Sequence, residues 1–355
     1  MISFVIPVYY KNRNHYIYKR ARYLVEIFGV QYPHIEVIIV DSSKVKKLNS
    51  AYSNVKIIPH QLKTNIYSPA IARNIGVENV SKKYIIFFDV DIDFHQNFLQ
   101  LLVKEVNNVL ETNKKSFLML PCLYLSEYGT EKWINSQDKL KTLYLYRESY
   151  LKGEIEFVLR LALNTSLIVL STSLFYKVGK FQENFYGHGG EDFEFLHRLV
   201  SYSPHSMKEE DYYSNVVEQF PAHYIGFRKY MAIYALEYFF TDLLTVHKWH
   251  ERSLGNIFYM KKNKNYKLLI EMMKLHDNNP KVYNYIWQNT SKPIELALFI
   301  NELQVQYGYD PLTYKGMFQF KKNVKLKSSF GAKIRKLFLQ PRMFFKDFFK
   351  KRMRK

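Results

Sequence analysis

Three aspartates at alternate positions are the first residues in this chain whose types and spacing could do chemistry. They are Asp89, Asp91 and Asp93, in the stretch FFDVDIDF. Alternate side chains of an extended chain share one face, so the three carboxylates would lie close together and repel one another. A hard divalent cation would offset this repulsion and could also hold phosphate groups. The alternative is a solvated strand end at which an acid caps the next helix.

A glycine-rich stretch with two adjacent acids is the second such feature. In FYGHGGEDFEF, Glu191 and Asp192 directly follow Gly189 and Gly190. Glycines let a backbone pass close to a ligand, and acids are favoured in the first turn of a helix by its dipole. The stretch therefore indicates either a binding site at the start of a helix or acids that merely cap that helix.

Short apolar runs that alternate with helical patterns position these acids. Alternation of this kind over about the first 115 residues predicts an open α/β sheet with right-handed crossovers, which binds ligands at the carboxyl ends of its strands. Asp41 and the Asp89–Asp93 acids both fall at such ends. Ser68 is the expected N-cap of one helix, with Pro69 in its first turn. The predicted strands are ISFVIPVY, IEVIIVD, NVKIIPH and KYIIFFDVDID; the predicted helices are 14–30, SPAIARNIGVENV and QNFLQLLVKEVNNVLETN.

These residues together resemble the family 2 glycosyltransferases with the GT-A fold, especially the capsule-polysaccharide type. The motifs VIPVYYKNR, IIVDSS, ARNIG and FFDVDID occur in that family's order and spacing. The stretch VGKFQENFYGHGGEDFEF is similar to the acceptor-side motif of galactosyltransferase-like and chondroitin-synthase-like enzymes. The implied fold is an open mixed sheet flanked by helices.

The resemblance implies a site for a UDP-sugar donor. Asp89 and Asp91 form the D-x-D pair, which in the family contacts the nucleotide ribose and a Mn²⁺ or Mg²⁺ ion on the sugar diphosphate. Asp41 stands where the family contacts the uracil. The donor contacts implied in this way are Pro7, Tyr9, Asp41, Arg73, Asp89 and Asp91.

The metal ion needs more ligands than one carboxylate. In related enzymes a downstream histidine completes the coordination, which implies His250 as the first choice beside Asp91 and His247 as the second. The H-x-x-H spacing in TVHKWHERS is weak by itself, because histidines near a tryptophan are more often core or surface residues. His223 is a further, weaker candidate.

The resemblance also assigns the acceptor side. Asp192 matches the catalytic base and Glu191 a contact to the acceptor hydroxyl, while Tyr186, His188, Gly189 and Gly190 match acceptor contacts. The chain departs from the family pattern at three positions, namely Lys180, Gln182 and His188. Acceptor identity therefore does not carry over from the family.

Length and composition limit the remaining possibilities. The 355 residues predict about two domains, and a hydrophobic content of 47% argues against wholesale disorder. The single cysteine, Cys122, fits a reducing compartment. The sequence predicts no signal peptide, and its longest uncharged run, 161–176, is too short and too polar to span a membrane.

The net charge of +20 is concentrated at the C-terminus. Residues 321–355 contain 14 Lys/Arg and one acid, so this segment carries +13 and the other 320 residues carry +7. Phenylalanines interleave with these cations, which favours an interfacial segment on an anionic membrane surface over a solvated basic end or a helix docked on a protein partner. Nucleic-acid binding is disfavoured, because the charge is terminal and the body lacks a recognised motif.

The predicted organisation is a GT-A catalytic domain at 1–255, a helical appendix at 256–320 and a basic amphipathic tail at 321–355. Within the catalytic domain, 1–115 is the nucleotide-binding half and 116–255 the acceptor-side half. The predicted function is a bacterial, metal-dependent, inverting glycosyltransferase that extends a surface polysaccharide at the inner face of the plasma membrane. Extension of a lipooligosaccharide or a glycoprotein glycan is an alternative, as is a non-catalytic membrane-bound assembly factor.

Overall fold

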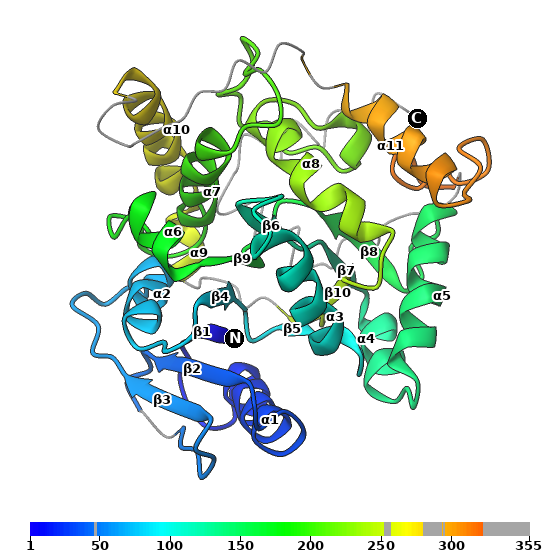
Figure 1. The fold of residues 1–355 in the computed structure, drawn as a ribbon. Helices are drawn as coiled ribbons and strands as arrows, with labels where there is room; N and C mark the ends of the chain where they lie inside the picture. Colours follow the sequence, from blue (N-terminus) through cyan, green and yellow to red (C-terminus); the bar gives the residue numbers. More distant parts are fainter. Residues whose placement is uncertain (46–47, 252–256, 280–292, 294, 322–355) are drawn as a thin grey trace, which may run out of the picture.

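A six-stranded sheet forms the centre of the computed structural model, which describes residues 1–45, 48–251, 257–279, 293 and 295–321 (Figure 1). Its strand order is β3-β2-β1-β4-β9-β6. The first four of these strands run parallel to one another, whereas β9 runs antiparallel to both β4 and β6. The strands are β1 (Ile2–Val8), β2 (Glu36–Asp41), β3 (Val55–Pro59), β4 (Tyr84–Phe87), β6 (Phe117–Met119) and β9 (Ile168–Ser171).

Helices cover both faces of this sheet, as a largely parallel sheet requires. Neighbouring residues of β1 enter different cores: Phe4 packs in a cluster with α1 and α3, and Val5 packs in a cluster with α2, α6, α7 and α8. Helix α3 continues into a π-helical turn at Val106–Leu110. The helices are α1 (Tyr16–Gln31), α2 (Pro69–Glu78), α3 (Phe98–Glu105), α6 (Thr172–Lys177), α7 (Glu191–Tyr202) and α8 (Phe227–Phe239).

A second sheet of four short strands, in the order β5-β10-β7-β8, lies beyond the end of β4. Strand β10 is parallel to β7 and antiparallel to β5, so it brings His247 opposite Ile92. Strand β10 thereby pairs with β5, the short strand that follows the turn after β4. The strands are β5 (Ile92–Asp93), β7 (Cys122–Leu125), β8 (Val158–Ala162) and β10 (Thr245–His247).

The C-terminal helices share a core with the preceding part of the chain. Leu269 and Met273 of α10 and Ile300 of α11 are fully buried in the same cluster as α7 and α8. Within the described residues, no helix has the length and apolar character needed to cross a membrane. The remaining elements are α4 (Glu127–Ile134), α5 (Lys139–Leu151), a 3₁₀ turn (Pro221–His223), α9 (Ile257–Met260), α10 (Lys262–Asn278) and α11 (Leu296–Gln306).

The predicted fold class, an open mixed α/β sheet flanked by helices, is confirmed. Ser68 is the N-cap of α2, and its side chain accepts a hydrogen bond from the Ile71 amide. The predicted fourth strand is too long, because β4 ends at Phe87 and the chain turns at residues 90–91. The predicted basic tail lies outside the described residues apart from Lys321.

Candidate active site

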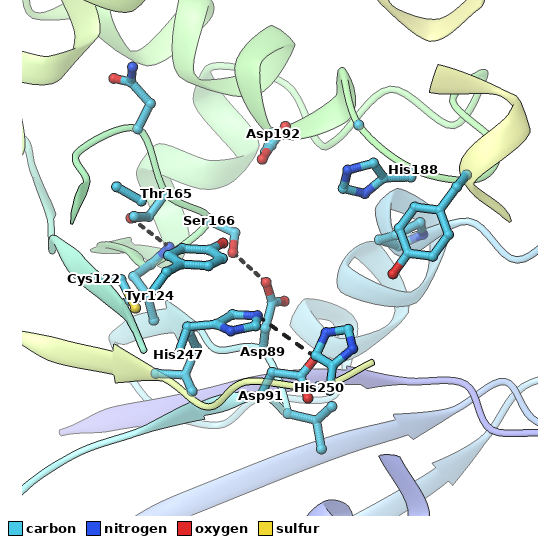
Figure 2. A pocket seen from close by; sticks show the side chains of 18 of the residues that line it. Asp89, Asp91, Cys122, Tyr124, Thr165, Ser166, His188, Asp192, His247 and His250 are labelled. Atoms are coloured by element: carbon cyan, nitrogen blue, oxygen red, sulfur yellow. Dashed lines mark hydrogen bonds and ion pairs between the residues drawn. The ribbon is translucent and has the colours of Figure 1, made fainter. Parts of the chain in front are cut away.

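A cavity of about 710 Å³ opens where the carboxyl ends of β1 and β4 meet the second sheet and the start of α7. Figure 2 shows Asp192 and His188 on one side of it and Asp89, Asp91, His247 and His250 on the other. Most of the residues singled out from the sequence line this one cavity. They are Pro7, Tyr9, Arg73, Asp89, Asp91, His188, Gly189, Glu191, Asp192, His247 and His250.

Asp91, His247 and His250 form a cluster that could hold a metal ion. One potential ligand atom from each lies within 4.8 Å of the others. The Asp91 Oδ2 atom is 3.6 Å from His250 Nε2 and 4.0 Å from His247 Nε2. One carboxylate and two imidazoles suit a divalent transition metal such as Mn²⁺ or Zn²⁺ better than they suit Mg²⁺, which prefers oxygen ligands. The donor set therefore fits an ion of the predicted kind and brings both candidate histidines to it.

Aromatic neighbours hold both imidazoles in place. His247 stacks on Tyr124 with ring centroids 4.2 Å apart, and His250 stacks on Tyr16 at 4.6 Å. Arg160 covers Tyr124, with its guanidinium carbon 3.9 Å from the ring centroid. Burial lowers the pKa of His247 to about 4 despite the opposing charge of Asp91, so its imidazole is neutral near pH 7 and has a lone pair for a metal.

Arg20 of α1 was not singled out from the sequence, yet it forms an ion pair with Asp91. Its other terminal nitrogen donates to the Trp249 carbonyl at 2.8 Å, so Arg20 also ties α1 to the segment that carries His250. Arg20 stands among several basic residues of a surface helix, and nothing in the local sequence distinguishes it. Only the contact with Asp91 reveals its place in the site.

Arg73 joins the two acidic motifs. Its Nη2 atom donates to Asp89 at 3.0 Å and its Nη1 atom to Glu191 at 3.2 Å, with 3% of the residue exposed. Burial alone would lower the pKa of Arg73, but Asp89 and Glu191 raise it. Ser166 donates to the other oxygen of Asp89 at 2.7 Å. The side chain of Asp89 is thus oriented from both sides, and Arg73 stays charged.

The expectation that Asp93 shares a face with Asp89 and Asp91 is wrong. The turn after β4 breaks the extended chain, and Asp93 enters β5 with 6% of its surface exposed. Lys139 and Lys248 each approach its Oδ2 atom to 3.3 Å, and Trp133 donates to that atom at 3.2 Å. Two lysines therefore neutralise Asp93 inside the protein, where it holds the second sheet together.

Glu191 and Asp192 open helix α7, as the glycine-rich stretch predicts. The chain reaches the helix through Gly189 and Gly190, whose φ angles of 84° and 103° favour glycine. Burial raises the pKa of both carboxyl groups, and for Glu191 the neighbouring charge of Asp192 adds to the effect, while Arg73 opposes it. A carboxylate with a raised pKa takes up a proton more readily than an exposed one, which suits a general base.

Four candidates do not line the cavity. Asp41 is 1% exposed and accepts hydrogen bonds from the Tyr10 hydroxyl at 2.8 Å and the Ser43 amide at 2.9 Å, so its carboxylate is used within the fold. The Tyr186 carbonyl accepts a hydrogen bond from Asn265, and Gly190 is the N-cap of α7. His223 is exposed in the 3₁₀ turn.

A buried ionic cluster fixes α7 behind these carboxylates. Glu194 accepts hydrogen bonds from Arg198 at 2.7 and 2.8 Å and lies 2.7 Å from the Nε2 atom of His276 in α10. All three side chains are fully buried. Arg198 also donates to the carbonyls of Val178 and Lys180, at the start of the loop that leads to Glu191. This cluster therefore positions the loop, α7 and α10 relative to one another.

Comparison with known proteins gives one family. The family model described as glycosyltransferase like family 2 matches residues 3–275, so the match extends past residue 255, the predicted end of the catalytic domain. No curated protein matches the chain.

Solved structures similar to the chain include those of TarS from S. aureus. TarS 1–349 in complex with UDP is 16% identical over 56% of this chain, with a TM-score of 0.33, and the chain spans 55% of its length. TarS 1–349 in complex with UDP-GlcNAc is 12% identical over 94% of this chain and 79% of its own, with a TM-score of 0.40.

Proposed function

Because the chain belongs to the glycosyltransferase like family 2, we propose that it is a metal-dependent, inverting enzyme that moves a sugar from a UDP-sugar to a hydroxyl of a growing surface polysaccharide. The observation that carries this proposal is the shared cavity of the Asp91–His247–His250 cluster and the Glu191–Asp192 pair. A cation site and a candidate base facing one space are what glycosyl transfer from a sugar diphosphate requires.

The donor side of the cavity runs from β1 to the metal cluster. Tyr9 and Tyr67 stack with ring centroids 5.2 Å apart and line the cavity, so they offer an aromatic wall to a nucleobase. Asp89, held by Arg73 and Ser166, would accept hydrogen bonds from the ribose. A divalent ion held by Asp91, His247 and His250 would neutralise the charge that develops on the diphosphate leaving group.

Asp192 is the proposed base on the acceptor side. Its carboxylate would take the proton of an acceptor hydroxyl as that oxygen attacks the anomeric carbon, a role typically worth about 10²–10⁴-fold in rate. Glu191 would hold the acceptor hydroxyl through its Oε2 atom, which is buried without a hydrogen-bond partner, while its Oε1 atom stays on Arg73. A single displacement of this kind inverts the anomeric centre.

The proposed setting is the inner face of the plasma membrane. The support is the charge of +13 on residues 321–355 and the phenylalanines among those cations. Anionic lipid would attract this segment, and attachment would raise the local concentration of a lipid-linked glycan acceptor.

The test is a panel of UDP-sugars with Mn²⁺ or Mg²⁺, with UDP release as the readout in the presence and absence of glycan acceptors. At least one UDP-sugar should release UDP, and EDTA should stop the release until a divalent metal is restored. Full activity in EDTA would contradict the metal dependence. Failure of every UDP-sugar to bind in calorimetry would contradict the donor class.

A further inference from the structure

Arg228 is a buried cation on the wall of the cavity, and no carboxylate of the described residues forms an ion pair with it. It lies in the first turn of α8 and is 8% exposed. Its Nη2 atom donates to the neutral side chain of Asn215 at 2.9 Å, and its Nε atom is buried without a hydrogen-bond partner. Among the residues that the structure describes, no ion pair joins Arg228 to an acid, in contrast to Arg73, which also lines the cavity and pairs with Asp89 and Glu191.

Aromatic rings hold the guanidinium of Arg228 in one place. Its central carbon lies 4.4 Å from the ring centroid of Phe193, 5.1 Å from that of Phe227 and 5.6 Å from that of Tyr266. Such contacts orient a guanidinium group. Its N–H groups point outward in the plane of the guanidinium and stay available to a planar anion. The fixed fork of donors matches a carboxylate or a phosphate, with which arginine forms two parallel hydrogen bonds.

The position of Arg228 relates it to the acceptor rather than to the donor. Phe193, on which it packs, directly follows the proposed base Asp192. Tyr266, whose ring centroid is 5.6 Å from the guanidinium carbon of Arg228, lines the same cavity as Asp192. The donor phosphates belong near the Asp91 cluster, on the other side of the cavity from Asp192 (Figure 2).

Arg160 is a second cation of this cavity, and its guanidinium carbon lies 3.9 Å from the centroid of the Tyr124 ring that stacks on His247. It lines the same cavity from β8 and also has no ion-pair partner among the described residues. Tyr224 lines the cavity as well; burial raises the pKa of its hydroxyl, and the charges of Arg160 and Arg228 both oppose that rise. The exposed Glu218 also lines the cavity, but it does not pair with either arginine.

We propose that Arg228, together with Arg160, binds an anionic group of the glycan acceptor, either a carboxylate or a phosphate attached to the sugar next to the attacking hydroxyl. This inference rests on the proposed function, because it assigns a subsite to the acceptor of that reaction. A buried cation is costly unless an anion pairs with it, so an acidic acceptor supplies a partner that a neutral acceptor lacks. The same cost gives the site its selectivity, since a neutral acceptor would leave the guanidinium desolvated and unpaired.

The test measures equilibrium binding of four saccharide probes to the full chain saturated with UDP and Mn²⁺. The probes are a disaccharide containing glucuronic acid, its carboxyl-reduced counterpart, a disaccharide carrying a phosphate monoester, and its dephosphorylated counterpart. The wild-type protein should bind at least one acidic probe at least tenfold more tightly than its neutral counterpart, equivalent to about 1.4 kcal/mol. The pair that shows the difference identifies the anion as carboxylate or phosphate.

Arg228→Met keeps the apolar contact with the three rings and removes the charge, so the acidic preference should fall below threefold. Lys229→Met is the matched control, because Lys229 is the next residue of α8, pairs with Glu209 and does not line the cavity. This control should keep the preference. Arg160→Met, on a separate sheet, should reduce the preference at least threefold and serves as the second variant if Arg228→Met does not fold.

Three results would overturn the inference. The first is equal or undetectable binding of all acidic and neutral probes, and the second is a preference for the acidic probe that survives in both arginine variants. The third is a loss of UDP affinity in Arg228→Met as large as its loss of affinity for the acidic probe. The last result would place Arg228 on the donor. UDP affinity, measured separately by calorimetry, distinguishes this failure from failure of the proposed function. A protein that binds UDP but ignores the acidic group keeps the proposed function and loses only this subsite.

Discussion

At the scale of single residues, Arg73 connects the parts of the site that are far apart in the sequence. It joins Asp89, 16 residues away, to Glu191, 118 residues away, through one buried guanidinium. Because both carboxylates pair with the same guanidinium, a change in the charge of one alters the electrostatic environment of the other. The residues of this site therefore act as a network, and single substitutions need a readout for each side of the cavity.

Asp91→Asn should abolish sugar transfer and weaken Mn²⁺-dependent UDP binding, because it removes the only carboxylate of the proposed metal cluster. The measurement is UDP binding by calorimetry with and without Mn²⁺, alongside transfer. Asp138→Asn, at the exposed N-cap of α5, is the control for loss of an acid outside the cavity and should leave both readouts unchanged. Full transfer by Asp91→Asn would contradict the assignment.

Asp192→Asn should lower kcat by about 10²–10⁴-fold and leave the affinity for the UDP-sugar nearly unchanged, because its role lies on the acceptor side. Glu191→Gln should affect the acceptor KM more than kcat, although it also weakens the contact with Arg73. Steady-state kinetics with both substrates varied would separate these effects. Loss of donor binding in Asp192→Asn would instead assign this residue to the donor.

At the scale of elements, the decisive contact is between α7 and α10. Glu194, Arg198 and His276 form a buried cluster directly behind the acids that begin α7. Leu269 and Met273 of α10 are fully buried against the same core. Helix α10 is therefore part of the structure that positions the candidate base, even though it lies within the segment 256–320 that the sequence predicts as a helical appendix.

Glu194→Gln should destabilise the protein by about 3–5 kcal/mol, because it leaves Arg198 buried without its anionic partner. Chemical denaturation at pH 7 measures this loss. The exposed Glu271→Gln of α10 is the matched control and should stay within about 0.5 kcal/mol of wild type. A change in the Glu194 variant no larger than that of the control would contradict a structural role for the cluster.

The destabilisation caused by Glu194→Gln should also depend on pH. Burial would raise the pKa of Glu194, but Arg198 and His276 lower it to about 2, against 4.5 for an ordinary glutamate. The charged group thus stabilises the fold above about pH 4.5, and this contribution is lost as the pH falls toward 2. The difference between variant and wild type should shrink across that range, in denaturation curves recorded at several pH values.

At the scale of the whole molecule, the charge is divided between a body and a tail. Residues 321–355 carry +13 of the total of +20. Each Lys or Arg near an anionic membrane contributes about 1 kcal/mol, so even half of these cations would give several kcal/mol. This electrostatic attraction would be enough for reversible attachment of the segment to a membrane surface.

A truncated protein that ends at Gly331 should lose most of its binding to liposomes that contain anionic lipid. Sedimentation with such liposomes at low and high salt compares it with the full chain, and neutral liposomes are the control. The truncated protein should keep its activity on short soluble acceptors, because the cavity is formed by residues up to Tyr266. Equal sedimentation of both proteins at both salt concentrations would show that the tail is not the anchor.

The sequence by itself determined the features that depend on local periodicity and on short motifs. Alternating strand and helix patterns located β1, β2, β3 and α2, because hydrophobic periodicity and capping residues act over a few positions. The same local reasoning placed Glu191 and Asp192 at the start of a helix. The family resemblance supplied Asp91, with His250 as the first choice of a second ligand and His247 as the alternative, and the structure brings all three into one cluster.

Only the tertiary structure decided which charges meet. The alternation of three aspartates grouped Asp93 with its neighbours, yet a turn sends it into the second sheet, where it meets Lys139 of α5 and Lys248 after β10. Side-chain alternation holds only while the chain stays extended. Arg20 reaches Asp91 and α10 reaches α7 through packing of segments far apart in the sequence. The unbalanced charge of Arg228 is of the same kind: a residue's partners depend on the burial and neighbours that the complete fold creates, and no local pattern encodes them.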